Sequence, residues 1–166
     1  AGAKEAEGAW RYGERTGVWT YYHSNGVVER LQSYRDDRED GAFTRFDARG
    51  QLAEEGAYAA GSKVGRWRSW HPGGDLASEE SFVAGEQDGS EKRFYPGGQL
   101  ASAGLWRAGK QIGRWVSHSE SGKLQLEEHY VDGARVGQST TWSVTGEVTS
   151  SGAYVADVRD GEWVEA

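Results

Sequence analysis

Histidines are the side chains best suited to metal binding or proton transfer near neutral pH, and the chain has four of them. They are His23, His71, His118 and His129, and no pair has the spacing of a zinc-binding motif. On a flat sheet, four strand spacings would separate His23 from His71 by about 19 Å, which is too far to share an ion. We therefore predict ordinary turn histidines, no metal and no other cofactor. For His118 we predict a packing role, with pH sensitivity as the alternative.

Two glutamates, Glu80 and Glu91, are expected to face each other across neighbouring strands, where like charges are unfavourable. A bound cation or a basic group of a partner could offset them, but we favour a solvated pair relieved by Lys92 and Arg93. A general acid and base pair is a further alternative, although the sequence indicates no cleft around these residues. The acidic segment 35–40 lacks the alternating spacing of a calcium loop, and we predict a solvated turn there.

Cations and rings are mixed in a third group, which could hold a phosphate chain or a single nucleic-acid strand. The group comprises Arg66, Arg68, Trp70, Lys92, Phe94, Arg114 and Trp115. Arginine covering an aromatic face is the commoner arrangement, and a net charge of −7 disfavours nucleic acid and anionic membranes. The chain also lacks Cys, a Gly-x-Ser-x-Gly motif and a long apolar run. We therefore predict that it is not an enzyme.

The elements that position these residues follow from a 24-residue repeat. Glycine recurs without insertion at positions 17, 41, 65, 89, 113, 137 and 161. In each of the six full repeats a second glycine and then an aliphatic residue follow, as in Gly65, Gly74 and Leu76. This regularity predicts one repeat array over residues 1–166. It has a partial repeat at 1–16, repeats starting at 17, 41, 65, 89, 113 and 137, and a closing strand at 161–166.

Two aromatic columns run through the array. The first comprises Trp10, Tyr34, Tyr58, Phe82, Trp106, Tyr130 and Tyr154, and the second comprises Tyr22, Phe46, Trp70, Phe94, His118 and Trp142. Aromatic residues favour half-buried strands, 25 Gly indicate many turns, and no segment has a helical period. We predict an all-β fold, an elongated, twisted, single-layer antiparallel meander of tandem 24-residue β-hairpin repeats with about 14 strands.

Each repeat is predicted to contain a tight turn, such as 23–26, and a longer turn, such as 60–65. Pairing around the tight turns places Tyr22 opposite Val28 and Phe46 opposite Leu52. Around the longer turns, tryptophan falls opposite glycine in every second hairpin, in the pairs Gly8/Trp19, Gly56/Trp67, Gly104/Trp115 and Gly152/Trp163. The intervening pairs are Gln32/Phe43, Glu80/Glu91 and Glu128/Ser139. A ring can shield the backbone of a glycine, so this 48-residue superperiod supports the register.

The spacing of Trp67 and Trp70 presents a conflict, because residues an odd number apart in a regular strand point to opposite faces. Either both faces carry rings, or a β-bulge in each repeat gathers the rings on one face. We favour the bulge.

The columns resemble the bacterial MORN-repeat variant, which occurs in proteins named as YwqK-type antitoxins of toxin–antitoxin systems. The resemblance rests on Gly65-Arg66-Trp67-Arg68-Ser69-Trp70, Gly74-Asp75-Leu76, Phe82 and Gly85, and extends from about residue 8 to 163. It implies a hairpin array used for protein contacts, an antitoxin role and no catalytic residues. The chain departs from the pattern at Glu91, His118 and Ser139, which makes its surface uneven.

A thin sheet rich in rings predicts an interface. We expect a non-enzymatic scaffold that binds a protein partner or a second copy through Tyr22, Phe46, Trp67, Trp70, Phe94, Trp115 and Trp142. One alternative is an antitoxin or immunity protein whose acidic surface neutralises a toxin. Another is a lipid-binding module, which the negative charge disfavours. The opening Ala-Gly-Ala leaves two localisations open, an extracytoplasmic one after signal-peptide removal and a cytoplasmic one.

Overall fold

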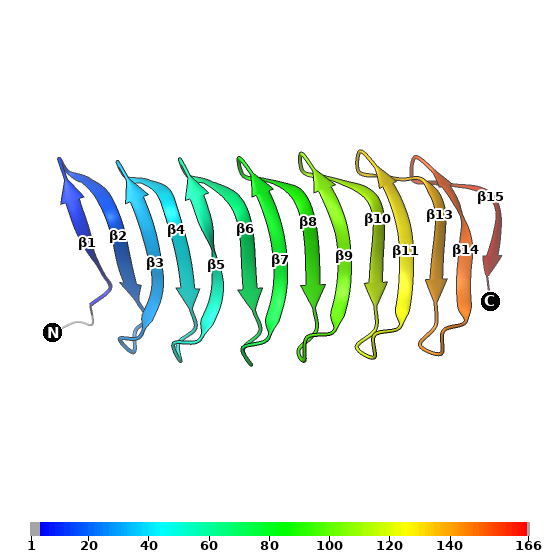
Figure 1. The fold of residues 1–166 in the computed structure, drawn as a ribbon, viewed down its shortest axis with the longest axis horizontal. Coiled ribbons are helices and arrows are strands. Elements are labelled where there is room, and N and C mark those ends of the chain that lie inside the picture. Colours follow the sequence, from blue (N-terminus) through cyan, green and yellow to red (C-terminus); the bar gives the residue numbers. More distant parts are fainter. Residues whose placement is uncertain (1–3, 166) are drawn as a thin grey trace. The chain divides into compact units, whose positions relative to one another are not determined.

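The predicted all-β meander is confirmed. The computed structural model describes residues 4–165, which form fifteen β-strands and no helix. The strands are β1 (Ala6–Arg11), β2 (Glu14–Tyr22), β3 (Val28–Arg35), β4 (Arg38–Phe46), β5 (Leu52–Ala59), β6 (Ser62–Trp70), β7 (Leu76–Val83), β8 (Glu86–Phe94), β9 (Leu100–Arg107), β10 (Lys110–His118), β11 (Leu124–Val131), β12 (Ala134–Arg135), β13 (Gly137–Trp142), β14 (Val148–Val155) and β15 (Val158–Glu165). They follow one another in chain order in one open antiparallel sheet (Figure 1). The short strand β12 pairs with β11 off this path.

The extra strand arises where one expected strand is interrupted. Between β12 and β13, the Val136 N–H donates to the carbonyl of His129 at 2.8 Å, and regular pairing resumes from Gly137. The chain divides into two compact units. Unit 1 comprises Ala1–Ala77 and Ser81–Glu86, and unit 2 comprises Ser78–Glu80 and Gln87–Ala166. Unit 1 therefore contains β1 to β6, and unit 2 contains β9 to β15.

The tight turns lie where they were predicted. In the turn between β2 and β3, the Gly26 N–H donates to the carbonyl of His23 at 2.8 Å, and Gly26 has a φ of 82°. This left-handed backbone suits glycine because it has no Cβ. The predicted pairs Tyr22/Val28 and Phe46/Leu52 are present in the register.

The longer turns, in contrast, are shorter than expected. Ala60 and Gly61, with φ of 48° and 85°, form a two-residue connection between β5 and β6, as in a type I′ hairpin. The interpretation of 60–65 as one long turn was therefore wrong. Gly65, which resembles a turn residue in the sequence, lies inside β6 with a φ of 67°.

Gly65 belongs to a β-bulge at the middle of the strand. Glu55 pairs with Arg68 and Ala57 pairs with Val64, so Gly56 alone faces the three residues 65–67. Equivalent register shifts occur opposite the glycines at positions 8, 104 and 152. The predicted bulge in the repeat is confirmed.

Each bulge brings a tryptophan ring directly over the glycine of the neighbouring strand. A Cβ added to Gly56 would lie 2.3 Å from ring atoms of Trp67, and the corresponding distance from Gly104 to Trp115 is 2.1 Å. Gly8 and Gly152 have the same relation to Trp19 and Trp163. Because real Cβ atoms do not approach other atoms this closely, only glycine fits beneath the ring. The predicted glycine–tryptophan pairs are confirmed.

Replacing Gly56 with alanine should therefore destabilise the protein by about 1–3 kcal/mol, the usual cost of overpacking. Gly73→Ala is the matched control, since its added Cβ would meet no atom within 4 Å. The free energies of unfolding of both variants can be measured by urea denaturation. Equal stabilities for the two variants would contradict the placement of the Trp67 ring over Gly56.

Candidate functional site

The tryptophans that lie over glycine and the first aromatic column share one side of the sheet, which we call the ring face. In unit 1, Trp19 meets Tyr34 edge-on with ring centroids 6.3 Å apart. Trp67 meets Tyr58 edge-on at 5.0 Å and stacks on Phe43 at 5.2 Å. Trp19, Tyr34, Phe43 and Trp67 are only 8%, 7%, 7% and 3% exposed. These rings are the apolar core of unit 1.

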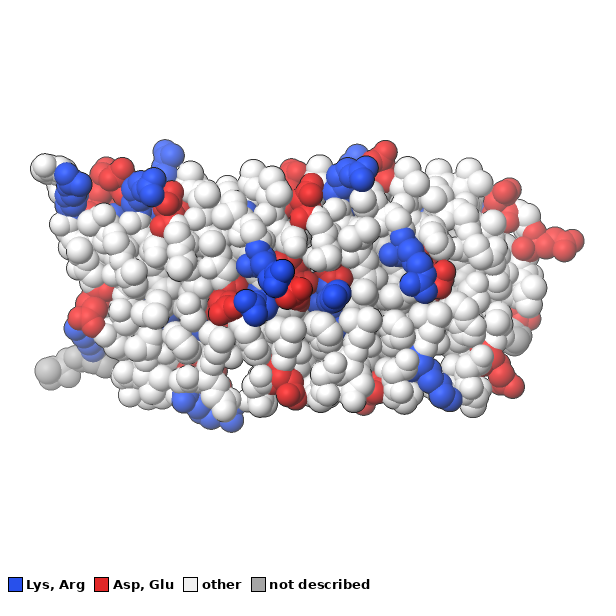
Figure 2. All heavy atoms as spheres, in the orientation of Figure 1, with Lys and Arg blue, Asp and Glu red and all other residues white. Residues whose placement is uncertain are grey.

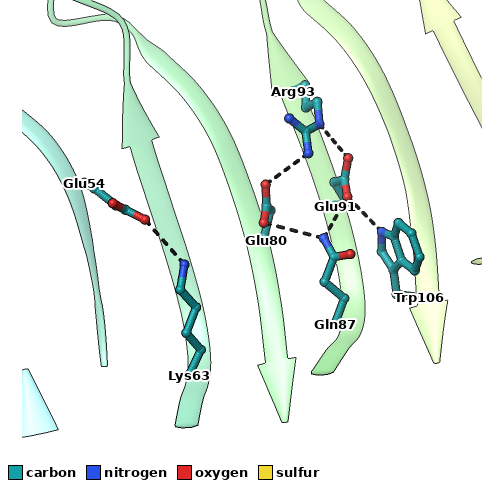
Figure 3. Close-up of polar contacts among 7 residues, drawn as sticks. All are labelled: Glu54, Lys63, Glu80, Gln87, Glu91, Arg93 and Trp106. Carbon is teal, nitrogen blue, oxygen red and sulfur yellow. Dashed lines mark hydrogen bonds and ion pairs between the residues drawn. The ribbon is translucent and has the colours of Figure 1, made fainter. Parts of the chain in front are cut away.

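Cations of the same chain cover several of these rings. The Lys63 ammonium lies 3.7 Å from the centre of the Trp67 ring and 5.3 Å from that of Phe82. The carboxylate of Glu54, on the neighbouring strand β5, holds this ammonium at 3.4 Å (Figure 3). A cation above a ring is attracted by the negative ring face, and the carboxylate fixes its position. Lys63 therefore closes this part of the ring face.

Arg15 and Arg159 occupy the positions 48 residues before and 96 residues after Lys63. The guanidinium of Arg15 lies 4.0 Å over Tyr34, and that of Arg159 lies 4.1 Å over Trp163. The side-chain hydrogen bond from Arg15 holds the pKa of Asp37 below its usual value. Sequence reasoning did not identify these cations, although their 48-residue spacing was a readable signal.

Unit 2 has a polar group where unit 1 has rings. Glu91 stands at the position of Trp67 in the repeat and is only 5% exposed. Its carboxylate accepts hydrogen bonds from Arg93 Nε at 2.7 Å, Trp106 Nε1 at 2.8 Å and Gln87 Nε2 at 3.0 Å (Figure 3). Arg93 also reaches Glu80 at 3.3 Å. The hydrogen bond to Glu91 raises the pKa of the Arg93 guanidinium.

Arg93 thus relieves the glutamate pair as predicted, whereas Lys92 forms no ion pair with either glutamate. The expectation of a solvated pair was wrong. Glu91 is buried because it replaces a ring in the core column of the ring face. Both oxygens of its carboxylate already accept hydrogen bonds from the chain. This arrangement accounts for Glu91 as a satisfied buried charge.

The second aromatic column lies on the opposite side of the sheet, which we call the open face. In the pairing of β3 with β4, Gln32 faces Phe43 on the ring face, so the preceding residue, Leu31, points to the open face. Leu31 and Phe46 line the same hollow. Both sides of the sheet therefore carry aromatic rings.

The expectation that the bulge gathers the rings on one face was accordingly wrong. The bulge at Gly65 lies before both Trp67 and Trp70 in β6, and the strand continues without another inserted residue between them. The two rings remain an odd number of residues apart and point to opposite sides.

Hollows lie beside Phe46 and Trp70 in unit 1. One of about 300 Å³ is almost entirely apolar and is lined by Val27, Val28, Leu31, Phe46 and Gly50. The other, of about 420 Å³, lies at the ends of two successive hairpins, where its lining includes Arg45, Leu52, Trp70, His71 and Pro72. These volumes are in the range of small-ligand sites, and their walls combine rings, aliphatic groups and a few polar groups.

The seven predicted partner-binding residues occupy two different environments. Trp67 is a core residue of the ring face, and Trp115 is half-buried beneath the same face. Tyr22, Phe46, Trp70, Phe94 and Trp142 belong to the second column and are half-buried. The structure thus brings Phe46 to a hollow of the open face. It brings Trp70 to a hollow at the hairpin ends that is also lined by Arg45 and Ser69 of the ring face, and it brings Trp67 to neither. The binding role of the seven residues stays a prediction.

Two of the histidines illustrate the backbone contacts of these residues, and Nδ1 of His118 is buried without a hydrogen-bond partner. His23 Nε2 is 3.0 Å from the carbonyl of Phe46, and the carbonyl of His118 accepts a hydrogen bond from Tyr95 at 2.9 Å. Within residues 4–165 no three His, Asp or Glu side chains are arranged to hold a metal ion. The same residues include no helix able to cross a bilayer.

Ion pairs account for several of the remaining charged candidates. Across the strands, Arg68 pairs with Glu55 at 3.0 Å and Arg114 with Glu127 at 2.7 Å. The expected covering of a ring by these arginines is replaced by salt bridges. In the segment 35–40, Arg35 pairs with Asp40 at 3.3 Å, and residues 36 and 37 form the exposed turn that was predicted.

Comparison with protein families agrees with the repeat geometry. The family described as "MORN repeat variant" matches residues 15–36, 63–84, 87–107 and 111–132, which together are 87 of the 166 residues. Each match begins at the position that Arg15 and Lys63 occupy in the repeat, and it ends at or just before the following two-residue turn. No curated protein matches the chain.

The buried hydroxyl of Tyr34 generates a pH prediction. Burial, together with a hydrogen bond to Tyr21, raises the pKa of Tyr34 to about 12, against about 10 in an unfolded chain. The contribution of the Tyr34 hydroxyl to the free energy of unfolding is therefore complete below pH 10. It falls by roughly 2–3 kcal/mol as the pH rises toward 12. Urea denaturation between pH 9 and 12 should show a steeper loss for the wild type than for Tyr34→Phe. Parallel curves would contradict this assignment.

Proposed function

The chain belongs to the MORN repeat variant family, and from this premise we propose that it is a non-enzymatic repeat scaffold whose open face binds a protein partner. The observation that carries the proposal is the apolar hollow beside Phe46 on the open face. A second hollow lies beside Trp70 at the ends of the hairpins. These two rings occupy the same position in successive repeats. A partner segment running across the strands could therefore place a side chain into the hollow beside Phe46 and contact the ring of Trp70.

Exposed aliphatic side chains support the same face in unit 2. Leu105, Val131 and Val155 are 46%, 57% and 60% exposed, and each is the strand neighbour of a residue on the ring face. By strand alternation they point to the open face. Apolar groups repeated in this way are characteristic of interfaces.

The distribution of charge favours a protein over a polyanion. On the side of the molecule in Figure 2, Lys and Arg atoms lie next to Asp and Glu atoms, and broad uncharged areas separate these groups. A nucleic acid or an anionic membrane would require an extended basic surface. A lipid-binding role is for this reason the less well supported alternative.

An antitoxin or immunity function is a more specific form of the same proposal, and the charge of unit 2 favours it. Unit 2 has 8 Lys and Arg against 13 Asp and Glu, a net charge of −5, whereas unit 1 has 11 against 13, a net charge of −2. An acidic surface steers a basic partner toward it. A basic toxin would thus meet unit 2 more readily than unit 1.

The test is affinity capture from the native extract, followed by reconstitution with the purified partner and measurement of Kd. The double variant Phe46→Ser/Trp70→Ser should weaken binding by at least tenfold, because buried aromatic anchors dominate protein interfaces. Tyr12→Ser is the control, since it removes a ring that is 93% exposed in a turn of unit 1.

Light scattering of the purified chain distinguishes a second copy from a different partner. A protein that remains monomeric and retains no partner would refute the scaffold proposal. A partner bound equally well by the wild type and the double variant would refute the assignment to the open face.

A further inference from the structure

One position of the superperiod breaks the pattern of ring-capping cations. Arg15, Lys63, Gln111 and Arg159 are equivalent residues at 48-residue intervals. Three of them place a cation 3.7–4.1 Å from the centre of a ring on the ring face. Gln111 is neutral and shorter than lysine or arginine. In unit 2 the rings beside Gln111 therefore lack the cation that the equivalent rings have.

A hollow of about 210 Å³ lies at this position. Its lining includes Ser102, Gln111, Trp115, Leu126, Glu128 and Tyr130. The equivalents of Gln111 and Ser102 in unit 1 are Lys63 and Glu54, the ion pair in Figure 3 that closes the ring face there. Replacement of this pair by a glutamine and a serine leaves room for a side chain from outside the chain.

The walls of the hollow suit a cation. The rings of Trp115 and Tyr130 meet edge-on with centroids 6.3 Å apart. Glu128, whose side chain is 13% exposed, accepts a hydrogen bond from the Tyr130 hydroxyl at 2.7 Å. Burial and this hydrogen bond raise the pKa of Tyr130, so the hydroxyl remains a neutral donor. Two rings and a partly buried carboxylate are the groups that recognise an ammonium or guanidinium.

Arg135, the cation that contacts Glu128, does not line the hollow. Arg135 lies 3.7 Å from Glu128, but its Nε is held at 3.0 Å by Asp157, and its guanidinium lies 4.1 Å over Tyr154. The side chain of Arg135 is thus held by the ring of Tyr154 and the carboxylate of Asp157. Its partial contact leaves Glu128 available to a second cation.

We propose that the hollow beside Gln111 receives a basic side chain of the protein partner, which supplies in trans the cation that Lys63 supplies within the chain. The inference rests on the proposed scaffold function and names the chemistry of one contact. It also agrees with the net charge of −5 on unit 2. The partner would present a lysine or arginine from a segment lying across β10 and β11.

The test uses the full chain labelled with ¹⁵N at the tryptophan indoles. A short Gly-Ser-Lys-Ser-Gly peptide is titrated and compared with the same peptide containing norleucine, which lacks the charge. The lysine peptide should shift the Trp115 indole signal saturably, and its Kd should be roughly fivefold to thirtyfold lower than that of the norleucine peptide. The Trp67 indole should not shift, because Lys63 already occupies the equivalent place.

Two variants make the test specific. Gln111→Lys should fill the hollow from within and abolish the Trp115 shift, and Glu128→Gln should weaken binding by at least fivefold. Gln99→Lys is the control, since it adds the same charge at an exposed turn residue of unit 2 and should leave binding unchanged. The remaining indole signals report whether each variant is folded.

Equal binding of the lysine and norleucine peptides, or undiminished binding by Gln111→Lys, would overturn the inference. These outcomes are independent of the capture experiment with the Phe46 and Trp70 double variant. The proposed binding of a basic side chain in the hollow can therefore be refuted while the scaffold function is upheld, and the reverse also holds.

Discussion

The fold depends on the direct contact between a tryptophan ring and the backbone of a glycine in the neighbouring strand. Any Cβ at Gly56 would lie within 2.3 Å of Trp67, so the contact fixes the register of β5 and β6. The ring reaches this position because the bulge at Gly65 places three residues opposite one. The left-handed glycine, the bulge and the tryptophan thus form one structural motif that recurs every 48 residues. In the intervening repeats the position of the tryptophan is taken by Phe43, Glu91 or Ser139.

This motif distinguishes the two sides of the sheet. The rings of the ring face are buried by one another and covered by Lys63, Arg15 and other cations, so most of that side is committed to stability. The open face carries Phe46 beside an apolar hollow and is the proposed binding surface. At the hollow beside Gln111 the ring face lacks an internal cation, and this hollow is the proposed site for a basic side chain of the partner.

The sequence predicted the features that depend on strict spacing. The hairpin period, the tight turns and the glycine–tryptophan pairs could be found because Gly56 and Trp67 recur in phase. The turn around Ala60 was misjudged because Gly65 resembles a turn residue until its φ within β6 is known. The two faces were confused because the position of the bulge relative to Trp67 sets the side on which each ring lies. The burial of Glu91 depends on Arg93, Gln87 and Trp106 converging, which residue spacing does not reveal.

The most direct test of the central contact is the NMR environment of the glycine Hα protons. Glycines at positions 8, 56, 104 and 152 should show Hα signals shifted upfield by the ring current, with nuclear Overhauser contacts to the indoles of Trp19, Trp67, Trp115 and Trp163. Gly73, where an added Cβ would meet no atom within 4 Å, should show neither. Ordinary Hα shifts at Gly56, without contacts to Trp67, would contradict the central role of the glycine–tryptophan contact.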